Sequence, residues 1–452
     1  MTGKEVEEMN RLNQEAPHTY EEALSYIESI PKFTSKNTLD VTRAYLRLLG
    51  SPEKGPRVIH VAGTNGKGSV SAYLAKILQK AGSSAGLFIS PHLVDIRERM
   101  SIDGEMVSRE EFLDLFQRIL AVCGREGLPH PAYFEFLYLM AMVWFSEKKP
   151  DFLVLETGLG GRLDATNAGE KKDLTVITRI GIDHTQYLGT TLSEIAFEKA
   201  GILRENVPLI CLEEPSSAFS VIKKRAEETG APLYSVAPSA WSGSKVVAKG
   251  IDFSFCGLYH GKGNDNEDTM GSVRALLPTH GLYQMENASL ASAAALVLGI
   301  SPSVIKQGLE ETFWPGRMEE IFPGVFLDGG HNADGIRAFL SSAGALSPGQ
   351  GGNRILLFSV VSDKDYRAML RRIFEAGIFD VIRAVPMPGA RALKREALEE
   401  TVEELHKEFP APRVRVEKES VEEAFDALLK EKRKEDLLFV SGSLYLVGIL
   451  KG

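Results

Sequence analysis

The amino-acid sequence predicts an α/β protein with two domains, and two observations support this. Apolar, strand-like runs alternate with segments of helical periodicity along most of the 452 residues, which is typical of parallel sheets with helices on their faces. A chain of this length also exceeds one ordinary hydrophobic core. The stretch FWPGRME, residues 313–319, contains Pro and Gly and predicts the linker. We therefore expect domains at 1–314 and 315–452.

The expected elements follow from local periodicity. Residues 19–30 and 40–50 place apolar side chains about 3.6 positions apart and predict helices. Alternation begins next, with strands expected at 57–63, 84–90, 151–157 and 174–181 and helices at 68–82, 108–123 and 134–148. Residues 231–282 are typical of antiparallel hairpins around a polar tip. A helix is expected at 284–300. A second, Rossmann-like α/β set has strands expected at 324–330, 354–361, 380–387, 413–417 and 436–442.

Composition excludes several classes of protein. The net charge of −9 argues against a general nucleic-acid binder, which would carry a basic stripe. No run of about 18 apolar residues is present, so we expect no membrane span, and the N-terminus lacks the apolar run of a secretion signal. The three cysteines lie too far apart for a disulfide framework or a metal knuckle. A reducing cytoplasm is the expected location.

The stretch GTNGKGS lies between a predicted strand and a predicted helix, as a phosphate loop does, and it comprises Gly63, Thr64, Asn65, Gly66, Lys67, Gly68 and Ser69. A helix N-terminus contributes only about 0.3–1 kcal/mol toward an exposed anion. Lys67 is therefore needed to neutralise a triphosphate, with a Mg²⁺ that Ser69 is placed to bind. These features predict a P-loop ATPase-like sheet domain, although GKGS replaces the usual GK[ST]. A Gly-rich turn without a ligand is the alternative.

Polar residues follow several predicted strands. Glu156 ends one strand, Ser90 and His92 follow another, and His184 follows a third, while Lys199 lies on a predicted helix. Each has an ordinary alternative, as a solvated strand end, a packed histidine or a solvated lysine. Because open α/β sheets bind ligands at the carboxyl ends of their strands, we expect these side chains to form one site.

Together these segments resemble a known family, the folylpolyglutamate synthases, which also occur as bifunctional dihydrofolate synthases and are related to the muramyl ligases of cell-wall synthesis. The resemblance runs in order from about residue 58 to the end of the chain. It rests on HVAGTNGKGSV, SPHL, ETGLGGRLDATN, DHTQYLG, EKAGI, PGRME, DGGHN, SDKD and VSGSLYLVG. It implies an ATP-dependent ligase that phosphorylates a carboxylate of a folate. The amine of L-glutamate then attacks the acyl phosphate, and an amide, ADP and phosphate result.

The resemblance also implies roles for single residues. The catalytic residues would be Lys67, His184 and Lys199. One Mg²⁺ would be bound by Ser90 and Glu156 beside Ser69, and a second by Glu156, His184 and Lys199. In this family the lysine is carbamylated, which meets a physical need, because a lysine with a pKa of about 10.4 is cationic and repels Mg²⁺. Pairing of Lys199 with Glu198 or another acid is the alternative.

The resemblance implies nucleotide contacts by Asn287, which precedes the second domain, and by Arg317, Asp328 and His331 within that domain. ATP would then lie between two domains, which must close to assemble the site. The SDKD residues Asp363 and Lys364 are expected at the cleft, with a plain loop as the alternative. The further partners implied are L-glutamate and a reduced folate or dihydropteroate, and members of the family are often monomeric.

The sequence departs from the family pattern at Tyr283, where His is common, at Ile89, where Thr is common, and over 243–272. Arg97 and Arg99 could meet substrate carboxylates or belong to a solvated loop. A muramyl ligase is an alternative function, but only 57 residues precede the loop strand, too few for its usual additional domain. A non-catalytic nucleotide switch is another, yet no guanine-reading NKxD is present. The choice between first glutamylation, chain extension or both stays open.

Overall fold

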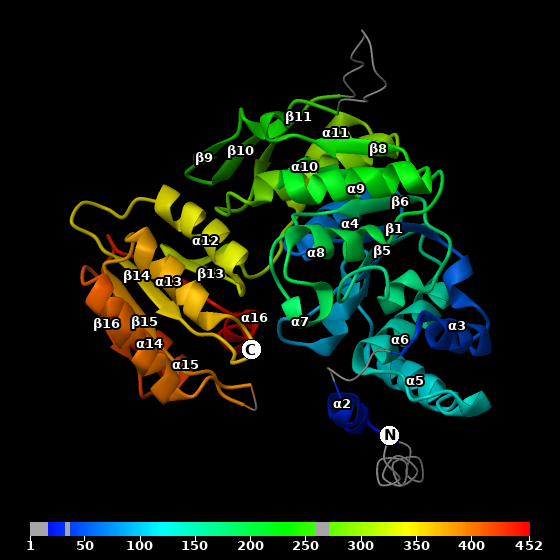
Figure 1. Cartoon of the computed structure of the whole chain (residues 1–452), viewed down its shortest axis with the longest axis horizontal. Helices are drawn as coiled ribbons and strands as arrows, with labels where there is room; N and C mark the ends of the chain where they lie inside the picture. The colour runs from blue at the N-terminus through cyan, green and yellow to red at the C-terminus, as the bar shows by residue number, and fades with distance from the viewer. Residues whose placement is uncertain (1–16, 32–36, 259–270, 390) are drawn as a thin grey trace.

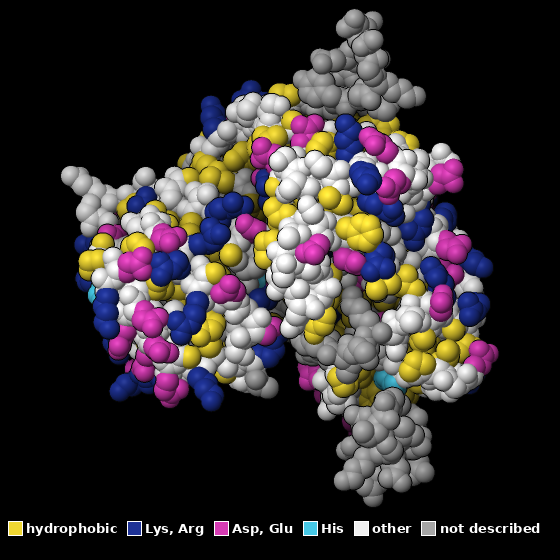
Figure 2. Space-filling view, viewed as in Figure 1, with side chains coloured by type: hydrophobic (Ala, Val, Ile, Leu, Met, Phe, Trp, Pro, Cys, Tyr) yellow, Lys and Arg dark blue, Asp and Glu magenta, His cyan; other side chains and the backbone are white. Residues whose placement is uncertain are grey.

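The computed structural model describes residues 17–31, 37–258, 271–389 and 391–452. The described chain forms two α/β lobes that lie side by side (Figure 1). We call residues up to Glu311 the N-terminal lobe and residues from Arg317 the C-terminal lobe. Within the described part, no helix is both long enough and apolar enough to cross a lipid bilayer. Lys and Arg side chains are mixed with Asp and Glu over both lobes on the face in Figure 2.

The N-terminal lobe is built on an eight-stranded sheet in the order β4-β3-β2-β5-β1-β6-β7-β8. Six strands are parallel: β1 Arg57–Ala62, β2 Ala85–Phe88, β5 Phe152–Glu156, β6 Leu174–Ile177, β7 Leu209–Leu212 and β8 Leu233–Val236. The short strands β3 Met100–Ile102 and β4 Glu105–Met106 form an antiparallel hairpin at one edge. Parallel strands next to β1 therefore end at the same edge of the sheet.

Helices cover both faces of this sheet because its central strands are apolar on both sides. Ile59 and Val61 of β1 belong to one core, while Val58 belongs to another. The first core packs against α4 Lys67–Lys80, α10 Gln284–Val297 and α11 Pro302–Glu311. The second packs against α2 Tyr20–Ser29, α3 Leu39–Leu48, α5 Arg109–Leu120 and α6 Tyr133–Lys148. A third cluster involves α7 Thr185–Leu188, α8 Leu192–Ala200 and α9 Ser216–Thr229.

The prediction of antiparallel hairpins over 231–282 is partly wrong. Strands β9 Lys245–Val247, β10 Gly250–Phe255 and β11 Val273–Leu277 do form a small antiparallel sheet. Leu233–Val236, however, pairs parallel with β7 as the last strand of the main sheet. This edge strand has only four residues and three of them are half-buried, so its apolar signal is weak. Its neighbour β7, buried but equally short, was not predicted either. The predicted polar tip lies largely at 259–270, outside the described residues.

The C-terminal lobe has a six-stranded sheet in the order β12-β13-β17-β14-β15-β16. Strand β12 Arg317–Phe322 pairs antiparallel with β13 Val325–Asp328. The remaining pairs are parallel and comprise β14 Arg354–Phe358, β15 Val381–Ala384, β16 Arg413–Val416 and β17 Leu437–Ser441. The helices are α12 Ala333–Ala345, α13 Tyr366–Ala376, α14 Arg395–Glu408, α15 Val421–Glu431 and α16 Leu444–Ile449. The predicted α/β class with two sheets is confirmed.

Asp436, just before β17, provides a test of stability in the C-terminal lobe. It is buried, and its carboxylate accepts hydrogen bonds from the backbone N–H groups of Asn353 at 2.8 Å and Arg433 at 2.9 Å, and from the Arg433 guanidinium at 2.8 Å. Burial opposes ionisation, but the Arg433 side-chain bond and the backbone donors outweigh it, so the pKa of Asp436 falls to about 2.

Because this pKa lies below its unfolded value, the carboxylate stabilises the fold above about pH 4 and loses that effect as the pH falls toward 2. We expect Asp436→Asn to lower the unfolding free energy by about 1–2 kcal/mol at pH 7, measured by urea denaturation. The difference should shrink at pH 3. Asp426→Asn, at an exposed position on α15, is the control and should change little.

Candidate functional site

One cavity of about 590 Å³ lies between the two lobes. Its walls come from the carboxyl edge of the N-terminal sheet, the start of α10, and the first strands of the C-terminal lobe. Most residues that the sequence placed in the site line it: Gly63 to Ser69, Ser90, Glu156, His184, Lys199, Asn287, Arg317, Asp328 and His331. His92, expected in the same site, lines a neighbouring cavity instead. The structure therefore brings together residues that are up to 268 positions apart in the chain.

The phosphate loop joins β1 to α4, and α4 begins at Lys67. Gly66 has φ of 90°, a left-handed conformation that favours glycine, and a side chain there would collide with the Asn287 amide. A Cβ on Gly68 would lie 3.1 Å from Cζ2 of Trp314, in the segment between the lobes. The unusual GKGS sequence thus has a structural reason, since the second Gly of GKG makes room for Trp314.

Glu156 is the buried carboxylate of this site. It ends β5 with 3% of its surface exposed, and its Oε2 accepts a hydrogen bond from the Ser90 N–H at 3.0 Å. Its Oε1 lies 3.9 Å from the Lys67 ammonium. Burial raises the pKa of Glu156 above its ordinary value, against the opposing effects of Lys67, Ser90, and Arg317. The ionised form of a carboxylate that is removed from water in this way is stabilised by any further cation placed beside it.

His184 and Lys199 approach the same loop from the other side. His184 has φ of 51° and precedes α7, and burial, opposed by Asp183, lowers its pKa to about 4. It is therefore a neutral imidazole at pH 7, the form that binds metals. Lys199 on α8 is buried and donates a hydrogen bond from Nζ to the Gly63 carbonyl at 2.7 Å. Its neighbour Glu198 pairs with Arg162 at 2.9 Å.

Other contacts order the side of the cavity that α10 and the C-terminal lobe form. Asp328 at the end of β13 accepts hydrogen bonds from the backbone N–H groups of Gly330 at 2.8 Å and Met318 at 3.1 Å, and from the Tyr283 hydroxyl. Tyr283, the departure from the family pattern, thus supplies a donor that orients Asp328. Gln284, which the sequence analysis missed, donates to the Ser69 hydroxyl at 3.3 Å and accepts from Asn287 at 2.8 Å.

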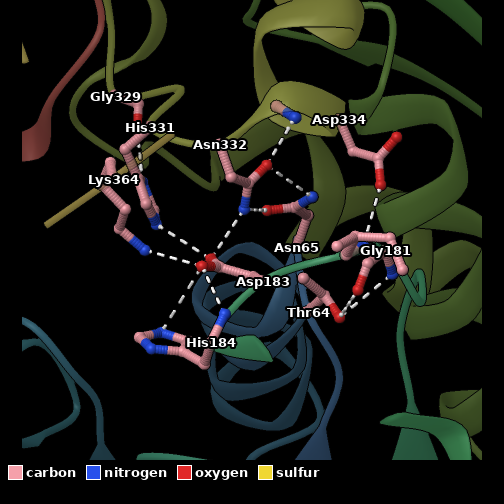
Figure 3. Close-up of polar contacts among 12 residues, drawn as sticks. Thr64, Asn65, Gly181, Asp183, His184, Gly329, His331, Asn332, Asp334 and Lys364 are labelled. Carbon is pink, nitrogen blue, oxygen red and sulfur yellow. Dashed lines mark hydrogen bonds and ion pairs between the residues drawn. The ribbon is translucent and has the colours of Figure 1, made fainter. Parts of the chain in front are cut away.

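A polar network joins the lobes around Asp183, next to His184 (Figure 3). Its carboxylate accepts hydrogen bonds from Lys364 Nζ at 2.8 Å and Asn332 Nδ2 at 2.9 Å. Asn332 also exchanges amide hydrogen bonds with Asn65 of the phosphate loop. Burial opposes ionisation of Asp183, but Lys364 and two neighbouring histidines hold its pKa well below the usual range. The sequence analysis missed Asp183 and Asn332, although both stand inside quoted motifs.

The structure shows the surroundings of the residues for which the sequence left two interpretations open. Lys364 lies at the cleft, whereas Asp363 pairs with Arg391 of its own lobe at 2.5 Å. Arg97 pairs with Asp95 at 2.7 Å. Arg99 is buried, donates to His92 Nδ1 at 2.9 Å and stacks over the Tyr133 ring. These two arginines do not belong to a solvated loop, and Ile89 is a buried core residue.

Comparisons with known proteins identify the family to which the chain belongs. The family described as Mur ligase, glutamate ligase domain, matches residues 316–444. A dihydrofolate synthase/folylpolyglutamate synthase of Bacillus subtilis is 33% identical over 446 residues, covering 96% of this chain and 98% of the relative. The chain belongs to the folylpolyglutamate synthase family. A folylpolyglutamate synthase of Lacticaseibacillus casei is 30% identical over 96% of this chain and 98% of its own length.

Solved structures of folylpolyglutamate synthases share the whole fold. The E. coli FolC protein in complex with DHPP and ADP superimposes with a TM-score of 0.82 at 30% identity, over 97% of this chain and 98% of that chain. A Mycobacterium tuberculosis folylpolyglutamate synthase complexed with ADP gives a TM-score of 0.84 at 26% identity, over 96% and 97%. The α/β architecture of both lobes is therefore that of the family.

The network around Asp183 can be tested by Lys364→Met. The change leaves the buried Asp183 carboxylate without its lysine partner, with only the Asn332 amide from the other lobe, so we expect the lobe contact to weaken by about 2–4 kcal/mol. Calorimetry should show a lower unfolding temperature, and small-angle X-ray scattering a larger radius of gyration. Arg391→Met removes a neighbouring ion pair that stays within one lobe and is the control. Identical behaviour of the two variants would contradict the role of Asp183 in holding the lobes together.

Proposed function

We propose that this protein is an ATP-dependent ligase that adds L-glutamate to a reduced folate, to dihydropteroate, or to both, through an acyl phosphate. The observation that carries the proposal is the interlobe cavity of about 590 Å³, in which a phosphate loop, a buried carboxylate and a neutral histidine meet side chains of the C-terminal lobe. The E. coli relative that shares both lobes was solved with DHPP and ADP. We also propose domains at 1–314 and 315–452, and a cytoplasmic monomer.

In this proposal the nucleotide lies across the cavity. Lys67 and the backbone amides from Gly63 to Ser69 bind the β- and γ-phosphates, because the loop directs N–H groups and a helix N-terminus at them. Arg317 reaches the phosphates from the C-terminal lobe. Asp328 holds the ribose or adenine side, and Asn287 and His331 make further contacts with the nucleotide.

The cavity offers oxygen donors of the kind that Mg²⁺ binds, but too few carboxylates and histidines to hold the ion by themselves. Within the described residues, no group of three or more His, Cys, Asp or Glu could hold a metal ion. Glu156 and His184 must therefore be supplemented by the hydroxyls of Ser90 and Ser69 and by a modified Lys199. Mg²⁺ favours oxygen ligands, and when bound it would neutralise charge on the phosphates. We propose two such ions.

Lys199 fits this role only after carbamylation, because an ammonium repels a divalent cation. The neutral amine would attack CO₂, form the N–C bond and release one proton. The product is an anionic oxygen donor beside Glu156. Burial of Lys199 supports the proposal, since a low-dielectric setting favours the neutral amine.

The reaction then needs two displacements. A carboxylate oxygen of the folate attacks the γ-phosphorus, the bond to the bridging oxygen breaks and ADP leaves. The glutamate amine next attacks the acyl carbon, phosphate leaves and the amine loses a proton. This chain contributes position and charge neutralisation. The C-terminal lobe excludes water from the reactive acyl phosphate when the lobes close.

The proposal is tested by phosphate release with ATP, Mg²⁺ and L-glutamate and three acceptor conditions: dihydropteroate, tetrahydrofolate and none. Release with tetrahydrofolate alone would indicate chain extension, and release with both acceptors would indicate a bifunctional enzyme. Release with neither would refute the proposed function.

Lys67→Met should lower kcat/KM by about 100- to 1,000-fold while the fold is kept, because removal of one preorganised charge or donor costs that much in comparable sites. Circular dichroism checks the fold. Turnover near that of the unsubstituted protein would contradict the assignment of Lys67 to the phosphates.

Lys199→Ala should lower turnover by about 100-fold or more, and formate or acetate should partly restore it by replacing the lost carboxylate. Glu198→Gln, one position earlier on α8 and paired with Arg162, is the matched control and should not respond to added acid. A labelled carbamate from isotopically enriched bicarbonate should appear in the unsubstituted protein by NMR and be absent in Lys199→Ala. Full activity of Lys199→Ala would exclude the proposed modification.

A further inference from the structure

A second cavity of about 380 Å³ lies along the phosphate-loop helix α4, between strand β2 and the segment that joins the lobes. Its floor is one face of α4, made of Gly68, Ala72, Ala75, Lys76 and Gln79. One wall is strand β2 with the β3–β4 hairpin, and the other is the interlobe segment 311–315. The small residues of the floor leave room for an extended chain to lie along the helix.

This second cavity begins at the reacting centre. Six residues line both cavities: Gly68, Ser90, Pro91, Glu156, Arg317 and Leu444. From there it follows α4 outward, and since a helix rises 1.5 Å per residue, Lys76 lies about 12 Å along the axis from Gly68. A substrate that places its terminal carboxylate at the γ-phosphate can therefore extend the rest of its chain into the second cavity. This path is separate from the space for the nucleotide.

The charges in the second cavity favour an anion at Lys76. Its ammonium donates to the Gln79 side-chain carbonyl at 2.9 Å, and within the described part of the chain no ion pair to it is found. The two acids on the outer walls are engaged elsewhere. Glu98 accepts hydrogen bonds from three backbone N–H groups at 2.6–2.8 Å, and Glu311 pairs with Lys80 at 2.5 Å. Lys76 is thus a half-buried cation whose charge is available to a ligand.

We propose that the second cavity holds the part of the folate substrate directly behind the reacting carboxylate, and that Lys76 binds an α-carboxylate of its glutamyl tail. The proposal rests on the proposed function. Each glutamate joined through its side-chain carboxylate leaves one α-carboxylate free, so a longer tail carries more anions. A tail of two or more residues extends along α4 and reaches Lys76, whereas the single α-carboxylate of a monoglutamate stays near the reacting centre.

The experiment compares KM for tetrahydrofolate carrying one and three glutamates in the full-length protein. Lys76→Met keeps the apolar stem and removes the charge, and it should raise the ratio of KM for the triglutamate to KM for the monoglutamate by about two- to fivefold, the effect of one partly exposed ion pair. Lys76→Arg should restore the original ratio. Lys224→Met, at an exposed lysine of α9, is the remote control.

The outcomes separate this proposal from the one on which it rests. Absence of phosphate release with every folate in the unsubstituted protein would refute the function itself. With that activity present, an unchanged KM ratio in Lys76→Met would overturn the assignment of the second cavity to the tail. A raised KM for L-glutamate with an unchanged ratio would also overturn it, because the second cavity would then take the incoming amino acid.

Discussion

The site depends on one geometric constraint, the common direction of strands β1, β2, β5 and β6. Parallel strands end at the same edge of a sheet, so the residues that follow them are brought together however far apart they are in sequence. Glu156 ends such a strand, and Gly63, Ser90 and His184 follow others. Apolar cores pack on both faces of the sheet and hold this edge in place. The polar side chains therefore come together because of where the strands end, and no direct contacts between distant polar residues are needed to assemble them.

The second constraint is burial of charge. Glu156 and Lys199 are each about 3% exposed, and an isolated charge in such a setting is costly. Partners within the protein reduce that cost, through the Ser90 N–H at Glu156 and the Gly63 carbonyl at Lys199. Neither charge is fully balanced by its backbone partner. This imbalance is the physical reason to expect a bound phosphate and a metal ion at this edge of the sheet. The elements that pack the sheet also create the electrostatic conditions for binding.

The C-terminal lobe completes the site through contacts that are few but buried. Asp183 meets Lys364 and Asn332 from the other lobe, and Asn332 in turn meets Asn65 in the phosphate loop (Figure 3). A change in the phosphate loop is therefore felt at the lobe contact. Trp314, packed over Gly68 in the segment between the lobes, provides a second route by which the loop and the lobe position are coupled. The phosphate loop and the lobe contact thus share these residues.

The sequence by itself determined the α/β class, most strands, the phosphate loop and the polar residues at strand ends, because each is a local pattern of a few neighbouring residues. It also placed most of its candidate residues on one cavity, since parallel strands leave little freedom in where their ends lie. Leu233–Val236 escaped it because a short, half-buried edge strand has almost no local signal. Only the tertiary structure decided that Asp183 joins the lobes, that Tyr283 orients Asp328 and that a second cavity runs along α4. These features arise where segments that are far apart in sequence pack together. The periodicity within one segment does not specify which surface of another segment will contact it.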